Sequence, residues 1–380
     1  MTMPTKESGA TQRVQVDACT LTLQPRLQRR PAIFDFTQAD RAASRQHTEP
    51  TGVTIMPITV SACLSKFRED YVDLPTTTSQ TARSSRDFLY GQIKTLSATH
   101  TILQGECVSF GSFARRTKMR PLDDIDCFAR LTSSNTKEHN SSAYTYNLHA
   151  AKESPLWIYS DSNDYVNSTE ILNAVKNALG TVSQYGSADV GRDGSAVVLG
   201  LKSYTWSFDV VPACLVSSGE SSWYLIPDGS GRWKRTDPRI DATRSETASK
   251  RHKTYFLPAA RILKYWNRKG GKPRLPSYYF ETLLTTRALA ASPYASLQNA
   301  VADLMLGVKS TVRGTCADPK GHEPNLDTGT SWETQCKVYD AASAAYDNLS
   351  AAITQEIAGN HKSAISYYRA VFGTDFPAYG

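Results

Sequence analysis

Three aspartates in this chain of 380 residues have the spacing and surroundings of a metal-binding site. Asp124 and Asp126 lie two positions apart in a run typical of a strand, so both side chains leave the same face of a sheet. Asp209 interrupts the apolar run 206–212, which alternates like a neighbouring strand. Carboxylates gathered on one face repel one another, and a divalent cation between them relieves the repulsion. Three of them can hold two Mg²⁺ ions, as in phosphoryl transfer.

Each acidic pattern also has a simpler interpretation. Asp124 and Asp126 alone could be two solvated side chains at an exposed sheet edge, and Asp123, offset by one residue, is ordinary surface charge or a helper. Burying Asp209 among apolar neighbours without a partner would be costly, however. The three acids together therefore favour a metal site over three unrelated surface charges.

A Gly-Ser pair precedes the acidic strand. Gly111 and Ser112 stand at an expected turn from strand to helix, where backbone N–H groups and the Ser112 hydroxyl can bind a phosphate. The dipeptide alone is a weak signal, since Gly-Ser turns are common and most bind nothing. Its position shortly before the aspartates is what makes it a candidate.

The positive charge of the chain is concentrated in one segment. The formal net charge is +7, yet residues 232–274 hold fourteen Lys and Arg against three acids, so this segment carries +11 and the remainder −4. A basic surface of that size usually meets phosphate, in nucleotides or in nucleic acid. A set of solvated helix faces is the alternative, and charge alone does not separate the two.

The apolar spacing predicts the elements that position these residues. We expect helices over 60–74, 80–98 and 167–179, strands over 101–108, 124–131 and 204–211, and a hairpin at Asp193-Gly194. The polar segment 132–165 indicates an insertion. The second half favours helices over 248–269, 277–291 and 333–357, with a further helix after them. The predicted fold class is α/β, a mixed sheet with helices followed by a helical lobe, with a central cleft between the two lobes.

Composition divides the chain into three expected parts. Residues 1–55 have dispersed charge and no sustained apolar period, so we expect a disordered tail, and we hypothesise that the natural chain begins at Met56. The expected α/β core covers 56–220 and the expected helical lobe covers 221–380. No stretch approaches the roughly 18 apolar residues of a membrane span. Seven scattered cysteines without a C-x-x-C pattern favour a reduced, cytoplasmic setting over a disulfide framework.

The order of these motifs resembles a known superfamily. GSFARRT, DID and the acid of FDVVP stand as in nucleotidyltransferases of polymerase-β-like fold. Within that superfamily the chain is similar to the bacterial relatives of cyclic GMP–AMP synthase and oligoadenylate synthase, the CD-NTases, which make second messengers in anti-phage (CBASS) defence. The resemblance covers most of 56–375. It includes RILKYWNRKGGKPRLPSYYFETLL, where such enzymes carry a helical lysine and a downstream Ser-Tyr.

The resemblance implies a role for each candidate residue. Asp124, Asp126 and Asp209 would be catalytic and would bind the metal ions. Gly111 and Ser112 would cradle the β- and γ-phosphates, Lys264 and Ser277 would close over them, and Arg115 and Thr117 would brace the loop as part of the nucleotide site. Without the resemblance, Lys264 would be interpreted as a surface lysine and Ser277 as a helix N-cap.

The implied activity is the joining of NTPs, ATP and GTP foremost, into a cyclic di- or trinucleotide with release of pyrophosphate. Two Mg²⁺ ions would assist, with Mn²⁺ as a substitute. A template-free enzyme that extends RNA or tRNA 3′ ends could use the same acids, whereas a non-catalytic nucleotide sensor would not need all three.

The resemblance also bears on partners. Eukaryotic relatives can carry a zinc insertion that senses DNA, and no matching Cys/His cluster stands in this sequence, which argues against direct activation by DNA. A regulatory protein of a defence operon is an expected partner, and a membrane is not.

Overall fold

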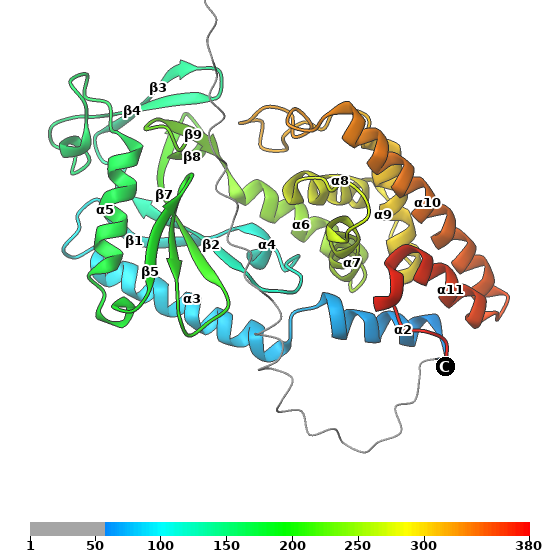
Figure 1. The fold of residues 1–380 in the computed structure, drawn as a ribbon. Helices are drawn as coiled ribbons and strands as arrows, with labels where there is room; N and C mark the ends of the chain where they lie inside the picture. The colour runs from blue at the N-terminus through cyan, green and yellow to red at the C-terminus, as the bar shows by residue number, and fades with distance from the viewer. Residues whose placement is uncertain (1–57) are drawn as a thin grey trace, which may run out of the picture. The chain divides into compact units, whose positions relative to one another are not determined.

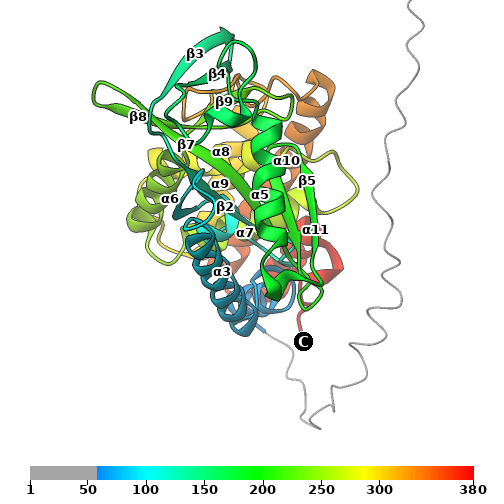
Figure 2. The same ribbon diagram turned by 90° about the vertical axis from the view of Figure 1, so that its left-hand side faces the viewer.

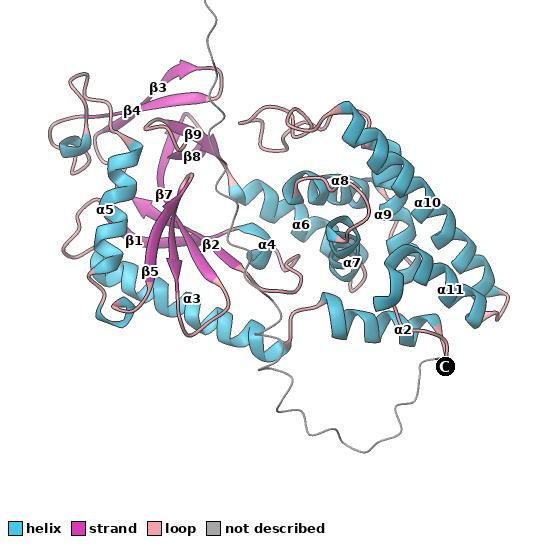
Figure 3. Cartoon of the chain, viewed as in Figure 1, coloured by secondary structure: helices cyan, strands magenta, loops and turns pink. Residues whose placement is uncertain are grey.

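A mixed β-sheet precedes a group of helices in the computed structural model, which describes residues 58–380 (Figure 1). The strands and the helices between them end at Thr236, and the described residues beyond it form helices and loops (Figure 3). The tail expected over 1–55 and the start expected at Met56 lie outside the described residues. Within the described part of the chain, no helix is long and apolar enough to cross a membrane.

In residues 58–380, nine strands form one sheet in the order β1–β2–β7–β8–β9–β4–β3, while β6 pairs with β7 and β5 pairs with β6. β2 and β7 run parallel, and the other pairs run antiparallel. The strands are β1 (Leu103–Ser109), β2 (Asp124–Leu131), β3 (Thr136–Ser142), β4 (Thr145–Ala150), β5 (Asp189–Asp193), β6 (Ala196–Gly200), β7 (Ser207–Ser218), β8 (Ser221–Pro227) and β9 (Trp233–Thr236).

The alternation of β2 and β7 decides where the acids point. Ile125 and Cys127 on β2 and Phe208 on β7 are buried in one core. Because successive side chains of a strand leave opposite faces, Asp126 and Asp209 project from the other face. The two aspartates are direct partners in the parallel register of β2 and β7. The expectation that the acids of the two strands share a face agrees with this arrangement.

Two helices cover the apolar face of the sheet. α3 (Thr76–Leu96) contributes Leu89 to the core, and α5 (Ser168–Gly180) contributes Ile171 and Val175. Figure 2 shows both helices in front of the strands. The acidic face of the sheet is therefore the one that α3 and α5 leave uncovered.

The other helices form a second core, which α2 joins although it precedes the sheet in sequence. Phe67 on α2 lies with its ring centroid 5.1, 5.2 and 5.3 Å from those of Tyr265, Phe372 and Phe376. The remaining helices and single turns are α2 (Val60–Phe67), η1 (Arg68–Val72), α4 (Gly111–Ala114), η2 (Trp157–Tyr159), η3 (Ser183–Tyr185), α6 (Pro238–His252), α7 (Phe256–Arg268), α8 (Ser277–Ala290), α9 (Leu297–Thr311), α10 (Trp332–Ile357), α11 (His361–Phe372) and η4 (Gly373–Asp375).

Three features differ from the expectations. The helix expected over 248–269 is interrupted where Lys253, with a positive φ of 52°, separates α6 from α7. The segment 132–165 holds β3 and β4, whose side chains are largely only half-buried or exposed, so its polar composition did not indicate strands. β8 and β9 continue the sheet beyond residue 220, and α2 belongs to the helical core although it precedes the sheet in sequence.

Replacing Phe67 with Ala should lower the free energy of unfolding by about 3–5 kcal/mol, because a fully buried ring that joins α2 to α7 and α11 is lost. Urea denaturation measures the change. Phe88→Ala is the matched control, since this ring on α3 is 44% exposed, and the expected loss is below about 1 kcal/mol. Equal losses in the two variants would contradict the packing of α2 in the helical core.

Candidate active site

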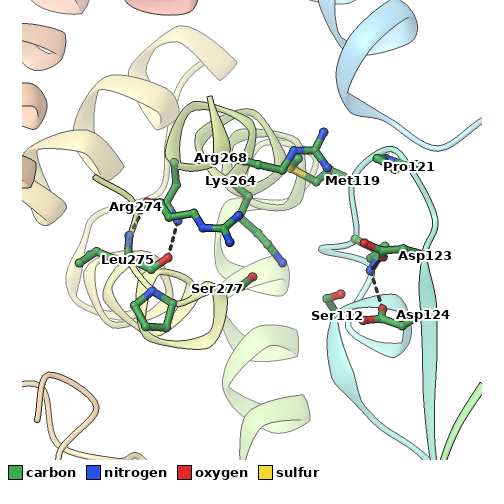
Figure 4. A pocket seen from close by; sticks show the side chains of 13 residues that line it. Ser112, Met119, Pro121, Asp123, Asp124, Lys264, Arg268, Arg274, Leu275 and Ser277 are labelled. Atoms are coloured by element: carbon green, nitrogen blue, oxygen red, sulfur yellow. Dashed lines mark hydrogen bonds and ion pairs between the residues drawn. The ribbon is translucent and has the colours of Figure 1, made fainter. Parts of the chain in front are cut away.

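A pocket of about 550 Å³ lies between the acidic face of the sheet and helices α7 and α8 (Figure 4). Ser112 and Asp124 stand on its sheet side, and Lys264 and Ser277 on its helix side. The cleft expected between the two lobes is thus confirmed, and it brings together four of the expected site residues. The complete lining is Ser112, Lys118, Met119, Pro121, Asp123, Asp124, Lys264, Asn267, Arg268, Arg274, Leu275, Pro276 and Ser277.

The Gly-Ser loop approaches the acids so closely that only glycine fits at its first position. Gly111 has a φ of +74°, and a Cβ there would lie 1.8 Å from Oδ2 of Asp126. After the single turn of α4, the backbone N–H groups of Thr117 and Lys118 donate to the carbonyl oxygen of Ser112 at 2.9 and 3.0 Å. The chain therefore folds back on Ser112 and fixes the loop beside the aspartates.

Asp126 and Asp209 carry more negative charge than their surroundings compensate. Burial, followed by repulsion from Asp124 and Asp209, raises the pKa of Asp126 to about 7. Burial, followed by repulsion from Asp124, raises the pKa of Asp209 to about 6. Both shifts arise because neighbouring carboxylates are held together away from water, which is the condition that a bound cation relieves.

Lys118, a residue that the sequence did not single out, forms an ion pair with the third acid, Asp124. Its ammonium group forms ion pairs with both Asp123 and Asp124, and its side chain is only 12% exposed. Burial alone would lower the pKa of Lys118, but the two aspartates outweigh it and raise the pKa above its usual value. Asp124 is thus compensated by a cation of the chain itself, unlike Asp126 and Asp209.

The donor atoms suit a hard cation such as Mg²⁺, since they are carboxylate oxygens and two of the acids repel one another. Nevertheless, in residues 58–380 no three His, Cys, Asp or Glu side chains gather closely enough to form a complete metal site. Asp126 and Asp209 fit a metal ion as they stand, whereas Asp124 is paired with Lys118.

Arg115 and Thr117 contact Glu281 and do not line the pocket. Arg115 Nε and Thr117 Oγ1 donate to Oε1 of Glu281 at 2.7 and 2.9 Å. Lys264 Nζ donates to Oε2 of the same carboxylate at 2.8 Å. Burial alone would raise the pKa of Glu281, but Arg115 and Lys264 lower it to about 2. Glu281 therefore joins the Gly-Ser loop to helices α7 and α8.

The sequence did contain a signal for Glu281. It is the single acid of the run SYYFETLL, among apolar residues of α8 that are buried with it. The same reasoning singled out Asp209, an acid within an apolar strand. Applied to α8, it would have marked Glu281 as a buried carboxylate in need of cationic partners.

The basic segment 232–274 only partly faces the pocket. Three of its fourteen cations, Lys264, Arg268 and Arg274, line the pocket. Most of the others bind acids or carbonyl groups of the protein, as Arg235 binds Glu138 and Arg261 binds Asp73. The segment therefore does not form one phosphate-facing surface, because most of its cations are paired with groups of the protein itself.

Comparison with known proteins identifies relatives of the whole described chain. No family model matches. A protein of Bacillus cereus (strain VD146) named as a probable cyclic nucleotide synthase is 32% identical over 329 residues, which cover 84% of this chain and 98% of the relative.

Solved structures with the same fold have much lower identity. CdnC of E. coli MS115-1, solved with ATP, has a TM-score of 0.62 at 18% identity and covers 83% of this chain and 98% of its own. CdnC has also been solved in complex with a HORMA protein. DncV of Vibrio cholerae, a cyclic AMP-GMP synthase solved with the linear intermediate pppA(3′,5′)pG, has a TM-score of 0.58 at 11% identity over 84% of this chain and 97% of its own. The fold class expected from the sequence is confirmed.

Replacing Glu281 with Ala should destabilise the protein by about 3–5 kcal/mol, because Arg115 and Lys264 would be left buried without their counter-ion. Chemical denaturation measures the loss. Glu246→Gln, which removes an exposed partner of Lys250 on α6, should leave stability nearly unchanged. If both substitutions cost the same, Glu281 does not join the two sides of the pocket.

The raised pKa of Asp126 predicts a pH-dependent stability in metal-free buffer. The folded protein keeps a proton on Asp126 up to about pH 7, whereas the unfolded chain releases it near pH 4. The stabilisation from this group is therefore complete below about pH 4 and is lost as pH rises to about 7. Relative to wild type, Asp126→Asn should gain stability as pH rises from about 4 to about 7, and the difference should level off above that in thermal melts with EDTA. A difference independent of pH would contradict the raised pKa.

Proposed function

The chain belongs to the family of cyclic nucleotide synthases represented by its Bacillus cereus relative, and we propose that it joins two or three NTPs into a cyclic oligonucleotide with release of pyrophosphate. The observation that carries the proposal is the pairing of Asp126 with Asp209, beside a pocket lined by Ser112, Lys264 and Ser277. Acids on one wall and phosphate-binding groups on the other suit the transfer of a nucleotide between two phosphorylated substrates.

The donor nucleotide binds with its phosphates against the Gly-Ser loop. Ser112 offers a hydroxyl group to the pocket, and the loop is fixed by its contacts with Asp126 and Glu281. Lys264 and Ser277 approach from α7 and α8. Because Lys264 is already paired with Glu281, its ammonium group is held in place before a nucleotide arrives, which lowers the entropic cost of binding.

The reaction forms a bond between an acceptor ribose oxygen and the α-phosphorus of the donor, and it breaks the bond from that phosphorus to pyrophosphate. The acceptor hydroxyl gives its proton to solvent water in the same step. Asp124, Asp126 and Asp209 would hold two Mg²⁺ ions, or Mn²⁺ in their place. Bound metal would lower the pKa of the acceptor hydroxyl and neutralise the charge that develops on the phosphates. The side chain of Lys118 would leave Asp124 for this to happen.

The same acids could serve an enzyme that extends RNA or tRNA 3′ ends. Similarity to a probable cyclic nucleotide synthase along 84% of the chain favours the cyclic product. ATP and GTP are the proposed substrates, in keeping with the ATP bound to CdnC and the AMP and GMP units joined by DncV.

A defence-operon partner belongs to the same proposal. CdnC forms a complex with a HORMA protein, and an analogous regulatory partner in anti-phage signalling would suit this chain as well. A cytoplasmic location, where NTPs are available, completes the proposal.

Incubation with all four NTPs and Mg²⁺ or Mn²⁺, followed by phosphatase and mass spectrometry, tests the function. A phosphatase-resistant cyclic product without any RNA primer is expected. The double variant Asp124→Ala/Asp126→Ala should abolish it, because the acids that hold the metal are removed. Asp340→Asn, an exposed acid on α10, is the control and should leave the product unchanged. Product formed only with an RNA primer, or undiminished in the double variant, would refute the proposal.

A further inference from the structure

Two arginines of the pocket have no partner among the described residues. Among residues 58–380, no acid or carbonyl group of the protein forms a hydrogen bond or ion pair with Arg268 or Arg274, and both side chains are exposed toward the pocket (Figure 4). Arg268 ends α7 and Arg274 stands in the loop before α8. Guanidinium groups in this position have five N–H donors each available to a ligand.

The absence of partners distinguishes these two arginines from most other cations of the basic segment 232–274. In the described part of the chain, eleven of the fourteen Lys and Arg of 232–274 contact a protein group, as Lys269 contacts Asp375 and Lys250 contacts Glu246. Three do not, and the third, Lys253, lies between α6 and α7 and does not line the pocket. Within the described residues, most cations of the basic segment thus have an acid, a hydroxyl or a carbonyl group of the protein as partner, whereas the two arginines of the pocket have none.

The two arginines are also close enough to repel one another. Burial lowers the pKa of Arg268, Asp123 and Tyr265 partly offset that effect, and the positive charge of Arg274 makes a smaller lowering contribution. Keeping two like charges together costs free energy in the empty site. An anion between them removes that cost, and a phosphate group accepts paired hydrogen bonds from each guanidinium fork.

We propose that Arg268 and Arg274 together bind the terminal phosphate of the donor NTP, and so make the site select triphosphates over diphosphates. This inference rests on the proposed function, in which the donor lies in this pocket. The α-phosphate, where the new bond forms, must lie near the acids on the sheet side. The far end of the chain of phosphates then reaches the helix side, where Arg268 and Arg274 stand. The terminal group carries the most charge of the three phosphates, which matches two unpaired cations.

Equilibrium binding of analogues that cannot react tests the selection. The probes are the α,β-methylene analogues of ATP and ADP, and of GTP and GDP, measured by calorimetry with Mg²⁺. Wild type should bind the triphosphate analogue at least about tenfold more tightly than the diphosphate, since each charge-assisted contact contributes about tenfold. Arg268→Gln/Arg274→Gln should remove most of this ratio and leave the affinity for the diphosphate nearly unchanged.

Matched variants separate geometry from charge and from folding. Arg83→Gln, an exposed arginine on α3, should keep the wild-type ratio. Arg268→Lys/Arg274→Lys keeps the charge but loses the paired donors, so an intermediate ratio is expected. Thermal melts should show no loss of stability in any of these variants, because neither arginine has a partner among the described residues, and the single Gln variants should each lose part of the ratio.

The outcomes distinguish this inference from the proposed function. If wild type makes the cyclic product but the double Gln variant keeps the wild-type ratio, the inference is overturned and the function stands. If wild type makes no cyclic product but the double variant loses the ratio, the inference stands without the function. A wild type that binds the triphosphate and diphosphate analogues equally overturns the inference.

Discussion

Glu281 is the contact on which the pocket depends, because both of its walls share this one carboxylate. One oxygen accepts from Arg115 and Thr117 of the loop after Ser112, and the other accepts from Lys264 of α7. A carboxylate so deeply buried is costly unless its cations stay in place. Moving the sheet away from the helices would break these contacts together, so the separation of the two walls is tied to an ionic interaction.

Glu281 is surrounded by opposite charges, whereas the side chains that face the pocket lie beside charges of the same sign. Asp126 and Asp209 repel one another on one side, and Arg268 and Arg274 repel one another on the other. The fold holds them together because β2 and β7 are fixed by their parallel register and because α7 and α8 are fixed by the helical core. Unfavourable local charge within a well-packed frame is common at functional sites, where a ligand supplies the missing counter-charge.

Local sequence patterns predicted many of the helices and strands but few of the contacts between residues that are distant in the sequence. Alternation is a property of neighbouring residues, so the strand expected over 124–131 matches β2, and the acids of β2 and β7 could be placed on one face. Glu281 was missed because its partners Arg115 and Thr117 are 166 and 164 positions away. The basic segment was overestimated for the same reason, since composition does not reveal which cations have distant partners. β3 and β4 were not predicted because most of their side chains are half-buried or exposed, so these strands lack the apolar alternation that indicates a strand.

The packing of Phe67 against Phe372 and Phe376 constrains the order in which the chain can fold during synthesis. The sheet and its two helices lie within 76–236, so their contacts are complete once that segment has left the ribosome. α2 emerges earlier, yet its partners are translated about 300 residues later. Such distant contacts form late because their loop must close first. The apolar side chains of α2, the first described helix, thus stay uncovered until the C-terminal helices have been translated. During that time α2 is a potential binding site for a chaperone.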